Sequence, residues 1–322
     1  MQGPWRIEGQ HLAEATAAVR AHARQTPLVD LAALGPGALA KLETEQETGS
    51  FKLRGALAAL AALDPAARAR GVVTASAGNH GYGLARAGAI LGVPVTVFVS
   101  GAAPRVKREG MERAGARVVA VGAAGYDDVE AEAREAAARE GLPFVSPFDD
   151  PRVAAGNGGT IGLELLDALP ALRTVVAPVG GGGLVAGLLA ALAARGSSAR
   201  VVGVTERGLP RHGAEPRPRP RADALRRRAD AGRGLEGGVS ESTFAAAKAL
   251  WRMEAVSEDA IASAMRFARR ELALPLEGSA AVALAWVLAH ASDAHLERPL
   301  VVILTGRNVD ARVLRAIGAA DA

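Results

Sequence analysis

Lys52 has the most distinctive chemistry of any residue in this sequence. The chain holds only four lysines, and all its other strongly basic side chains are arginines. Unlike arginine, lysine can lose its proton, act as a base and form a Schiff base with an aldehyde. Lys52 follows a Gly49-Ser50 turn and opens a helical pattern that continues from Leu53, so we expect it at a helix start, where backbone N–H groups are free. Taken alone, the position also suits an ordinary solvated lysine.

Two glycine-containing turns follow predicted strands and offer sites for anions. A turn from a strand into a helix presents free backbone N–H groups to a negatively charged group. A run of four glycines is entropically costly, but it lets the backbone approach a phosphate closely. The first turn alone is of ordinary frequency, whereas the glycine run indicates a ligand more than a flexible turn. The two turns read Ser76-Ala77-Gly78-Asn79-His80-Gly81 and Gly180-Gly181-Gly182-Gly183.

Two further segments add polar groups at expected element ends. Thr305 follows a strand pattern and is expected to place a hydroxyl at the strand end. Ser279 precedes a helical pattern over residues 281–289 and is expected to cap it. A Schiff-base lysine, a phosphate cradle, a polar loop and a strand-end hydroxyl together indicate a pyridoxal-phosphate site.

At these positions the chain resembles the fold type II pyridoxal-phosphate enzymes, and within them the serine/threonine dehydratase group. The matching segments occur in the family's order and extend over nearly the whole chain. They are residues 26–28, 48–56, 76–80, 107, 115–116, 158–164, 178–183, 277–280 and 305–310.

The resemblance implies a role for each residue of the site. Lys52 would be the catalytic residue and would carry the cofactor, Asn79 would contact the 3′-oxygen of its ring, and Thr305 would hydrogen-bond the ring nitrogen. The residues expected to bind pyridoxal 5′-phosphate are Phe51, Lys52, Asn79, Gly180, Gly181, Gly182, Gly183, Glu277 and Thr305. Those expected to bind the substrate are Ser76, Ala77, Gly78, Asn79 and His80.

The expected reaction is dehydration and deamination of L-threonine, L-serine or both, giving the 2-keto acid and ammonia by α,β-elimination. A Thr305 hydroxyl cannot hold the ring nitrogen protonated as a carboxylate would, and the resulting weaker electron sink suits elimination. Ala77 stands where serine racemases carry a second serine, which disfavours racemisation. Threonine synthase and dehydratases of hydroxyaspartate or phenylserine stay open as alternatives. Arg307 departs from the family pattern and either contacts a substrate carboxylate or pairs with a surface acid.

The composition bounds the class of protein. Hydrophobic residues make up 49% and charged residues 22% of the 322 residues, which is typical of a soluble globular chain. Cysteine is absent, which excludes disulfides and thiolate metal sites. We expect a cytoplasmic enzyme of small amino acids, without a metal, membrane or nucleic-acid partner. The family resemblance implies a homodimer.

Strand and helix patterns alternate along the chain and predict an α/β fold with two parallel, doubly wound sheets. Residues 1–68 and 149–322 are expected to form a large cofactor-binding domain, and residues 69–148 a small mobile domain. In such folds ligands bind beyond the carboxyl ends of the strands. The predicted strands are residues 72–76, 95–99, 116–120, 175–179, 201–204 and 300–304, with helices over 84–91 and 184–194.

Two alternatives of other classes are weaker. The strand, glycine turn, helix and strand around residues 175–206 also suit a nicotinamide-dependent oxidoreductase, but Val185 stands where the third fingerprint glycine is needed. The basic segment from Arg207 to Arg233 could bind nucleic acid, but its acidic residues and lack of aromatics favour a surface loop.

Overall fold

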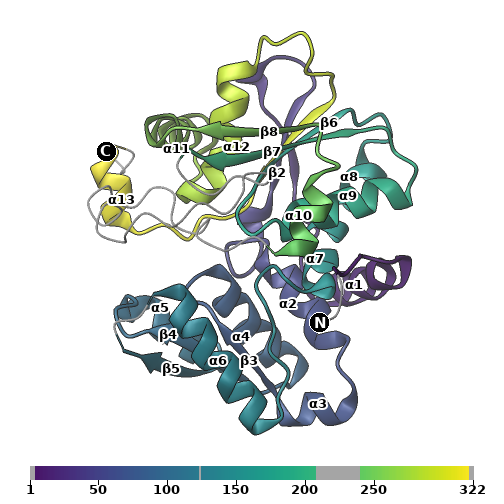
Figure 1. Ribbon diagram of the computed structural model, residues 1–322. Helices are drawn as coiled ribbons and strands as arrows, with labels where there is room; N and C mark the ends of the chain where they lie inside the picture. The colour runs from purple at the N-terminus through teal and green to yellow at the C-terminus, as the bar shows by residue number, and fades with distance from the viewer. Residues whose placement is uncertain (1–3, 123–124, 208–239, 319–322) are drawn as a thin grey trace.

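The computed structural model describes residues 4–122, 125–207 and 240–318, which form two separate parallel sheets (Figure 1). The six-stranded sheet has the order β1-β2-β9-β6-β7-β8, and only its edge strand β1 runs antiparallel to its neighbour. The three-stranded sheet has the order β3-β4-β5. We call the parts built on these sheets the large lobe and the small lobe. The strands are β1 Leu28–Asp30, β2 Ala38–Leu42, β3 Val72–Ala75, β4 Val95–Ser100, β5 Arg117–Val121, β6 Thr174–Pro178, β7 Arg200–Glu206, β8 Arg252–Val256 and β9 Leu300–Leu304.

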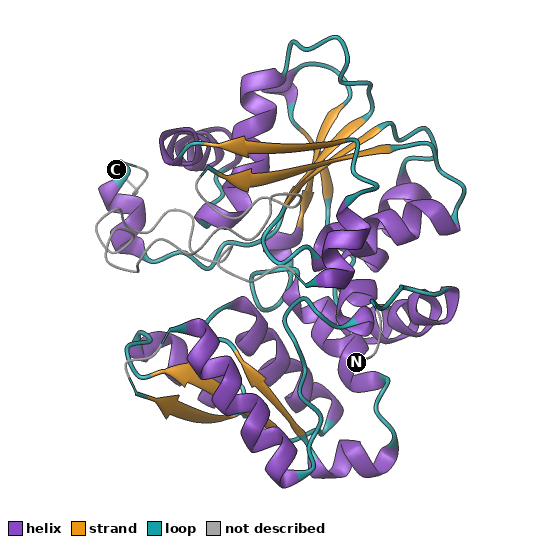
Figure 2. Cartoon of the chain, viewed as in Figure 1, coloured by secondary structure: helices purple, strands orange, loops and turns teal. Residues whose placement is uncertain are grey.

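Helices cover both faces of each sheet (Figure 2). In the large lobe Val302 packs on one side with α11 and α12, whereas its neighbour Val301 packs on the other side with α8 and α9. This alternation follows from the two-residue period of a strand. The helices are α1 Gly9–His22, α2 Lys52–Ala61, α3 Pro65–Arg70, α4 Asn79–Leu91, α5 Arg105–Arg113, α6 Tyr126–Glu140, α7 Pro151–Ala154, α8 Thr160–Ala168, α9 Gly183–Ala194, α10 Glu241–Ala247, α11 Glu258–Leu272, α12 Gly278–His290 and α13 Ala311–Ala316; η1 Ala32–Leu34 and η2 Glu43–Glu45 are 3₁₀ turns and η3 Ala155–Gly159 is a π-helical turn.

Helix α2 joins the two lobes (Figure 1). Its Leu53 and Leu57 are fully buried in the same apolar cluster as Val72 and Val97 of the small sheet. Its other side faces the large lobe, where the backbone N–H of Gly55 donates to Asn157 Oδ1 at 2.9 Å. The residue that begins this helix, Lys52, therefore lies at the junction of the lobes.

The six predicted strands all occur, with shifts of one or two residues at their ends. Strands β1, β2 and β8 were not predicted, because they are short or carry few of the β-branched residues that favour strands. The prediction that Ser279 caps its helix was wrong, since α12 begins at Gly278 and Glu277 occupies the N-cap position. The division into a large domain and a small mobile domain at residues 68/69 and 148/149 stays a proposal.

The basic segment from Arg207 to Arg233 lies, apart from Arg207 itself, outside the described residues. Among the described helices, none combines the length and the apolar composition that a membrane crossing requires.

Candidate active site

The loop before Lys52 is hydrogen-bonded to the end of strand β9. The backbone N–H of Phe51 donates to the carbonyl oxygen of Thr305 at 3.0 Å, and Ser50 forms an antiparallel bridge with Gly306. Gly49 adopts φ +69°, a conformation that favours glycine, as the chain turns into this contact. The start of α2 is therefore fixed beside the carboxyl end of β9, where ligands bind in parallel sheets.

The Lys52 side chain is partly buried at this junction. Burial lowers the pKa of its ammonium to about 8, and the nearby carboxylate of Glu277 opposes this shift. Its Nζ donates to the carbonyl oxygen of Pro147 at 2.9 Å. A lysine with this pKa is neutral for about a tenth of the time at neutral pH, so it can act as a base or nucleophile.

Asn79, the first residue of α4, reaches from the small lobe into the large one. Its Nδ2 donates to both carboxylate oxygens of Glu277, at 2.7 and 3.0 Å. Its Oδ1 accepts from Asn308 Nδ2 at 2.8 Å. The fold thus brings Asn79 into contact with Glu277 and Asn308, which lie 198 and 229 positions later in the sequence.

Glu277 is a buried carboxyl group at the N-cap of α12. Burial raises its pKa, and the hydrogen bonds from Asn79 and Ser279, together with the charges of Lys107 and Lys52, oppose this rise. Its Oε1 lies against Gly306, where a Cβ atom would come within 2.2 Å. Only glycine at position 306 leaves room for this carboxyl group.

The turn between β3 and α4 holds the residues predicted to bind substrate. Ser76 Oγ accepts from the backbone N–H of Gly78 at 3.2 Å, while Ala77 and Gly78 are not buried. His80 is buried, and its Nε2 lies 3.3 Å from the Val145 carbonyl oxygen. Burial and the charge of Lys52 lower the pKa of the His80 imidazole to about 3, so the ring is neutral and adds no charge. The α4 N-terminus beside this turn offers free N–H groups.

The glycine run connects β6 to α9 as predicted. Gly182 has φ +87° and precedes the first residue of α9. A Cβ at Gly181 would lie 2.3 Å from Cγ of Phe148, so this glycine is also required by close packing. No side chain of the run covers the N-terminus of α9, and this backbone cradle fits a phosphate group.

Arg307 does not extend toward Lys52. Its guanidinium pairs with Glu45 at 3.1 Å, and 40% of its side chain is exposed. Of the two interpretations of this residue, the structure supports pairing with a surface acid.

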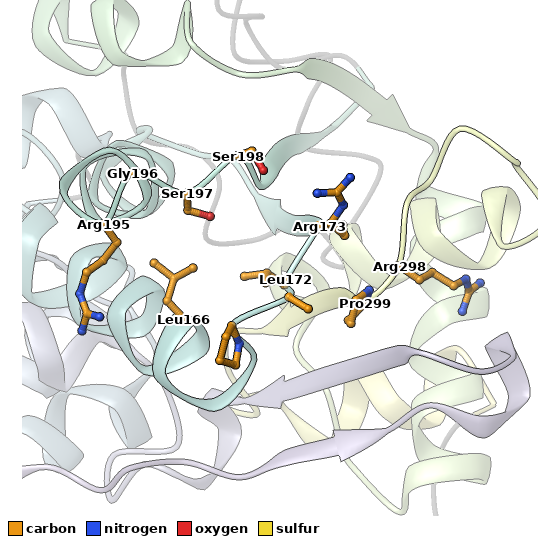
Figure 3. Close-up of a pocket in the computed structure, with 11 residues that line it drawn as sticks. Leu166, Leu172, Arg173, Arg195, Gly196, Ser197, Ser198, Arg298 and Pro299 are labelled. Carbon is orange, nitrogen blue, oxygen red and sulfur yellow. The ribbon is translucent and has the colours of Figure 1, made fainter.

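A surface pocket of about 600 Å³ lies away from Lys52, between Leu166, Leu172 and Pro299 (Figure 3). Its arginines are already paired, for example Arg173 with Glu297 and Arg195 with Asp167.

Within the described ranges, no group of three or more His, Asp or Glu side chains is placed to hold a metal.

Together, the fold and the site define a class: a two-lobed α/β protein with a partly buried lysine and a glycine-rich turn at the carboxyl ends of parallel strands. The family model of pyridoxal-phosphate-dependent enzymes matches residues 19–306. The chain therefore belongs to this family, and pyridoxal 5′-phosphate is its cofactor. This match favours the cofactor interpretation of the glycine run over the dinucleotide alternative.

Several similar proteins carry names of the predicted serine/threonine dehydratase group. An L-threonine ammonia-lyase of Thermotoga maritima is 38% identical over 283 residues, which cover 86% of this chain and 68% of that protein. The processed form of threonine deaminase isoform 2 from Solanum lycopersicum superposes with a TM-score of 0.84 at 30% identity, covering 98% of this chain and 90% of that one. Maize serine racemase gives a TM-score of 0.85 at 25% identity, covering 97% of each chain.

Sequence reasoning missed two contacts of the site. It did not predict that Asn308 would hold the amide of Asn79, or that the Pro147 carbonyl would accept from Lys52. Neither contact has a local sequence signal, because each joins segments that meet only in the folded chain.

Proposed function

We propose that this protein removes water from L-threonine and L-serine by α,β-elimination, releasing 2-ketobutyrate or pyruvate together with ammonia. The main observation behind this proposal is the position of the Lys52 amine near the carboxyl end of β9, where burial lowers its pKa to about 8. Similarity to the Thermotoga maritima L-threonine ammonia-lyase supports this choice of reaction.

The residues of the site fit the cofactor. Pyridoxal phosphate, when bound, supplies an aldehyde that condenses with amines and a ring that withdraws electrons from the carbon beside the amine. Lys52 would hold it through Nζ, and the backbone of Gly180, Gly181, Gly182 and Gly183 would hold its phosphate. Phe51, Asn79, Glu277 and Thr305 would surround its ring.

Substrate binding is assigned to the turn between β3 and α4. Backbone N–H groups at the start of α4 would bind the substrate carboxylate, which is anionic and suited to a helix N-terminus. Ser76, Ala77, Gly78, Asn79 and His80 form this turn. Because the His80 imidazole is neutral and buried, we assign recognition here to backbone groups and to the Ser76 hydroxyl.

Lys52 is the base of the reaction. Once it is free of the cofactor, its neutral Nζ takes the proton from the α-carbon of the bound amino acid, and a pKa near neutral pH matches this task. The bond between the β-carbon and the hydroxyl oxygen would then break, the hydroxyl would take up a proton and leave as water, and the electron pair left on the α-carbon would form the new double bond. Thr305 offers a hydroxyl instead of a carboxylate, so the ring would withdraw less of the negative charge on the α-carbon and loss of the hydroxyl becomes the main way to relieve it.

Two measurements test this proposal: the absorbance of the bound cofactor and the release of keto acid. The purified protein should absorb near the border of the visible and ultraviolet, and borohydride reduction should fix the cofactor on Lys52 in peptide mapping. Keto-acid release should then be measured with threonine, serine, 3-hydroxyaspartate and phenylserine. Turnover of O-phosphohomoserine without dehydration of threonine or serine would replace this proposal with threonine synthase.

Two further properties belong to the same proposal. We infer a homodimer and a cytoplasmic location, which light scattering and cell fractionation would test. A monomeric mass or recovery of the native protein outside the cytoplasm would contradict them.

A further inference from the structure

We propose that Glu277 and Asn308 are positioning residues that hold the side-chain amide of Asn79 in one orientation, so that an N–H of Asn79 faces the bound cofactor. This inference rests on the proposed function, because it takes Asn79 as a cofactor contact. It goes beyond that function by assigning to Glu277 and Asn308 an action through Asn79.

The orientation of each amide is determined by the groups at the two ends of the chain of hydrogen bonds. At one end, Asn308 Nδ2 donates to the Thr48 carbonyl oxygen at 2.8 Å, and a carbonyl can only accept. Asn308 must therefore present its NH₂ group there, and this same nitrogen donates to Asn79 Oδ1 at 2.8 Å. At the other end, the Glu277 carboxylate accepts from Asn79 Nδ2. We call this chain from Thr48 to Glu277 the amide relay.

A flipped Asn79 would break the amide relay at both ends. Its Nδ2 would then face the Asn308 NH₂ group, and its Oδ1 would face the Glu277 carboxylate. Both contacts would join like partners, and the second would place an oxygen dipole against a buried carboxyl group. A single orientation is therefore favoured strongly.

One hydrogen of Asn79 Nδ2 stays available in this arrangement. The nitrogen lies 2.7 and 3.0 Å from the two oxygens of one carboxylate. Seen from the nitrogen, these two oxygens lie much closer together in angle than its two N–H bonds do. One hydrogen is shared between the two oxygens, and the second can donate to another acceptor.

Two glycines make room for the amide relay. A Cβ at Gly306 would lie 2.2 Å from Glu277 Oε1, and a Cβ at Gly49 would lie 2.6 Å from Asn308 Oδ1. Gly49 also has φ +69°. Both glycines belong to segments that flank Lys52 and Thr305, so the space around the site is shaped for these side chains.

The decisive test reverses the amide relay instead of only removing it. In Asn308→Asp, the new carboxylate faces Asn79 Oδ1, so Asn79 must flip or lose a partner. Adding Glu277→Gln supplies an NH₂ group for the flipped Asn79 Oδ1, so the double variant restores both hydrogen bonds with Asn79 reversed. The unfavourable contact of the introduced carboxylate with the Thr48 carbonyl is common to both variants and cancels when they are compared.

We expect the double variant to recover its stability but not its affinity for the cofactor. The double variant should regain most of the melting temperature lost in Asn308→Asp. Its apparent dissociation constant for pyridoxal phosphate, measured from holoenzyme absorbance at known free cofactor, should remain about tenfold or more above wild type, the loss of one good hydrogen bond. Its absorbance maximum should also shift, because an oxygen now faces the cofactor.

Two results would overturn the inference. In one, the cofactor affinity of the double variant recovers together with its melting temperature, which would make the amide relay purely structural. In the other, both variants bind cofactor as wild type does. Arg307→Gly, a neighbouring change on the surface, is the matched control and should bind cofactor normally. A wild-type protein that never binds pyridoxal phosphate would instead refute the proposed function itself.

Discussion

Two polar clusters lie on different sides of the first turn of helix α2, and their electrostatics differ. Lys52 faces the active site, whereas Arg54, two positions later, points to the other side of the helix into the large lobe. Arg54 joins Lys41, Glu43 and Glu164 in what we call the ionic cluster. The site cluster consists of Lys52, Asn79, His80 and Glu277.

Each side chain of the ionic cluster has an opposite charge or a hydrogen-bond partner in place. Arg54 contacts Glu43 at 2.8 Å and Glu164 at 2.6 Å, and Lys41 contacts Glu164 at 2.6 Å. Burial alone would lower the pKa of Arg54, but Glu43 and Glu164 more than offset this and raise it. Burial would raise the pKa of Glu164, but Arg54 and Lys41 lower it. Both groups are therefore held in their charged forms.

The site cluster shows the opposite pattern. Burial lowers the pKa of Lys52 to about 8 and that of His80 to about 3, and it raises the pKa of Glu277. All three groups are moved toward their neutral forms, because the partners of Lys52 and Glu277 compensate for burial only in part and the charge of Lys52 adds to the effect of burial on His80. Complete pairing holds these groups in their charged forms, whereas incomplete pairing shifts the pKa values toward the neutral forms, which is typical of groups that transfer protons in catalysis.

The largest expected effect comes from removing the reactive member of the site cluster. Lys52→Ala should reduce keto-acid release from threonine by roughly 10³-fold or more, because the protein loses both the base and the cofactor anchor. The circular dichroism spectrum should be unchanged. Lys248→Ala, which removes an exposed lysine, is the control and should retain full activity. Comparable activity in the two variants would contradict the assignment of Lys52.

The second effect is on stability and distinguishes the clusters directly. Arg54→Met leaves the fully buried Glu43 without its ion-pair partner, removes one of the two partners of the partly buried Glu164, and should lower the free energy of unfolding by about 3–5 kcal/mol. In the cofactor-free protein, Lys52→Met should leave that free energy unchanged or raise it, because it removes a charge that burial disfavours. Urea unfolding monitored by circular dichroism measures both. Equal destabilisation by the two variants would show that the clusters do not differ in kind.

The third prediction concerns pH. The folded-state pKa of Lys52 is depressed, so the fraction of neutral amine rises with pH and levels off above about 8 instead of above about 10.5. After removal of the cofactor, its rate of reincorporation should increase about tenfold per pH unit below this value and then level off. Stopped-flow absorbance measures the rate, with a lysine peptide as the control amine. A rate that keeps rising to pH 10 would contradict the depressed pKa.

The smallest effect is expected at Arg307. Its ion pair with Glu45 is exposed, and such pairs contribute about 0–1 kcal/mol. Arg307→Gly should therefore leave the kinetic constants for threonine, serine and 3-hydroxyaspartate within about twofold of wild type. A selective loss of activity with 3-hydroxyaspartate would show that Arg307 reaches the substrate in solution.

The parts of the site that depend on single residues could be predicted from local patterns. Glycine runs, strand patterns rich in valine and the isolated Lys52 have chemical meaning without a partner in space, because backbone conformation and side-chain reactivity depend on the residue itself. The strand 300–304, a helix over 184–194 and the position of Lys52 at a helix start were all predicted and are confirmed, with the helix beginning one residue earlier than predicted, at Gly183.

Which side chains are fully paired and which only in part depends on how the chain folds in three dimensions. Glu164 and Glu277 are the same residue type, yet one has a lowered and the other a raised pKa. Arg54 and Lys41 lower the pKa of Glu164, whereas burial raises that of Glu277 and the hydrogen bond from the distant Asn79 offsets this only in part. Local patterns predict the elements that carry these groups, but desolvation and Coulomb interactions depend on distances that exist only once the two lobes are folded together.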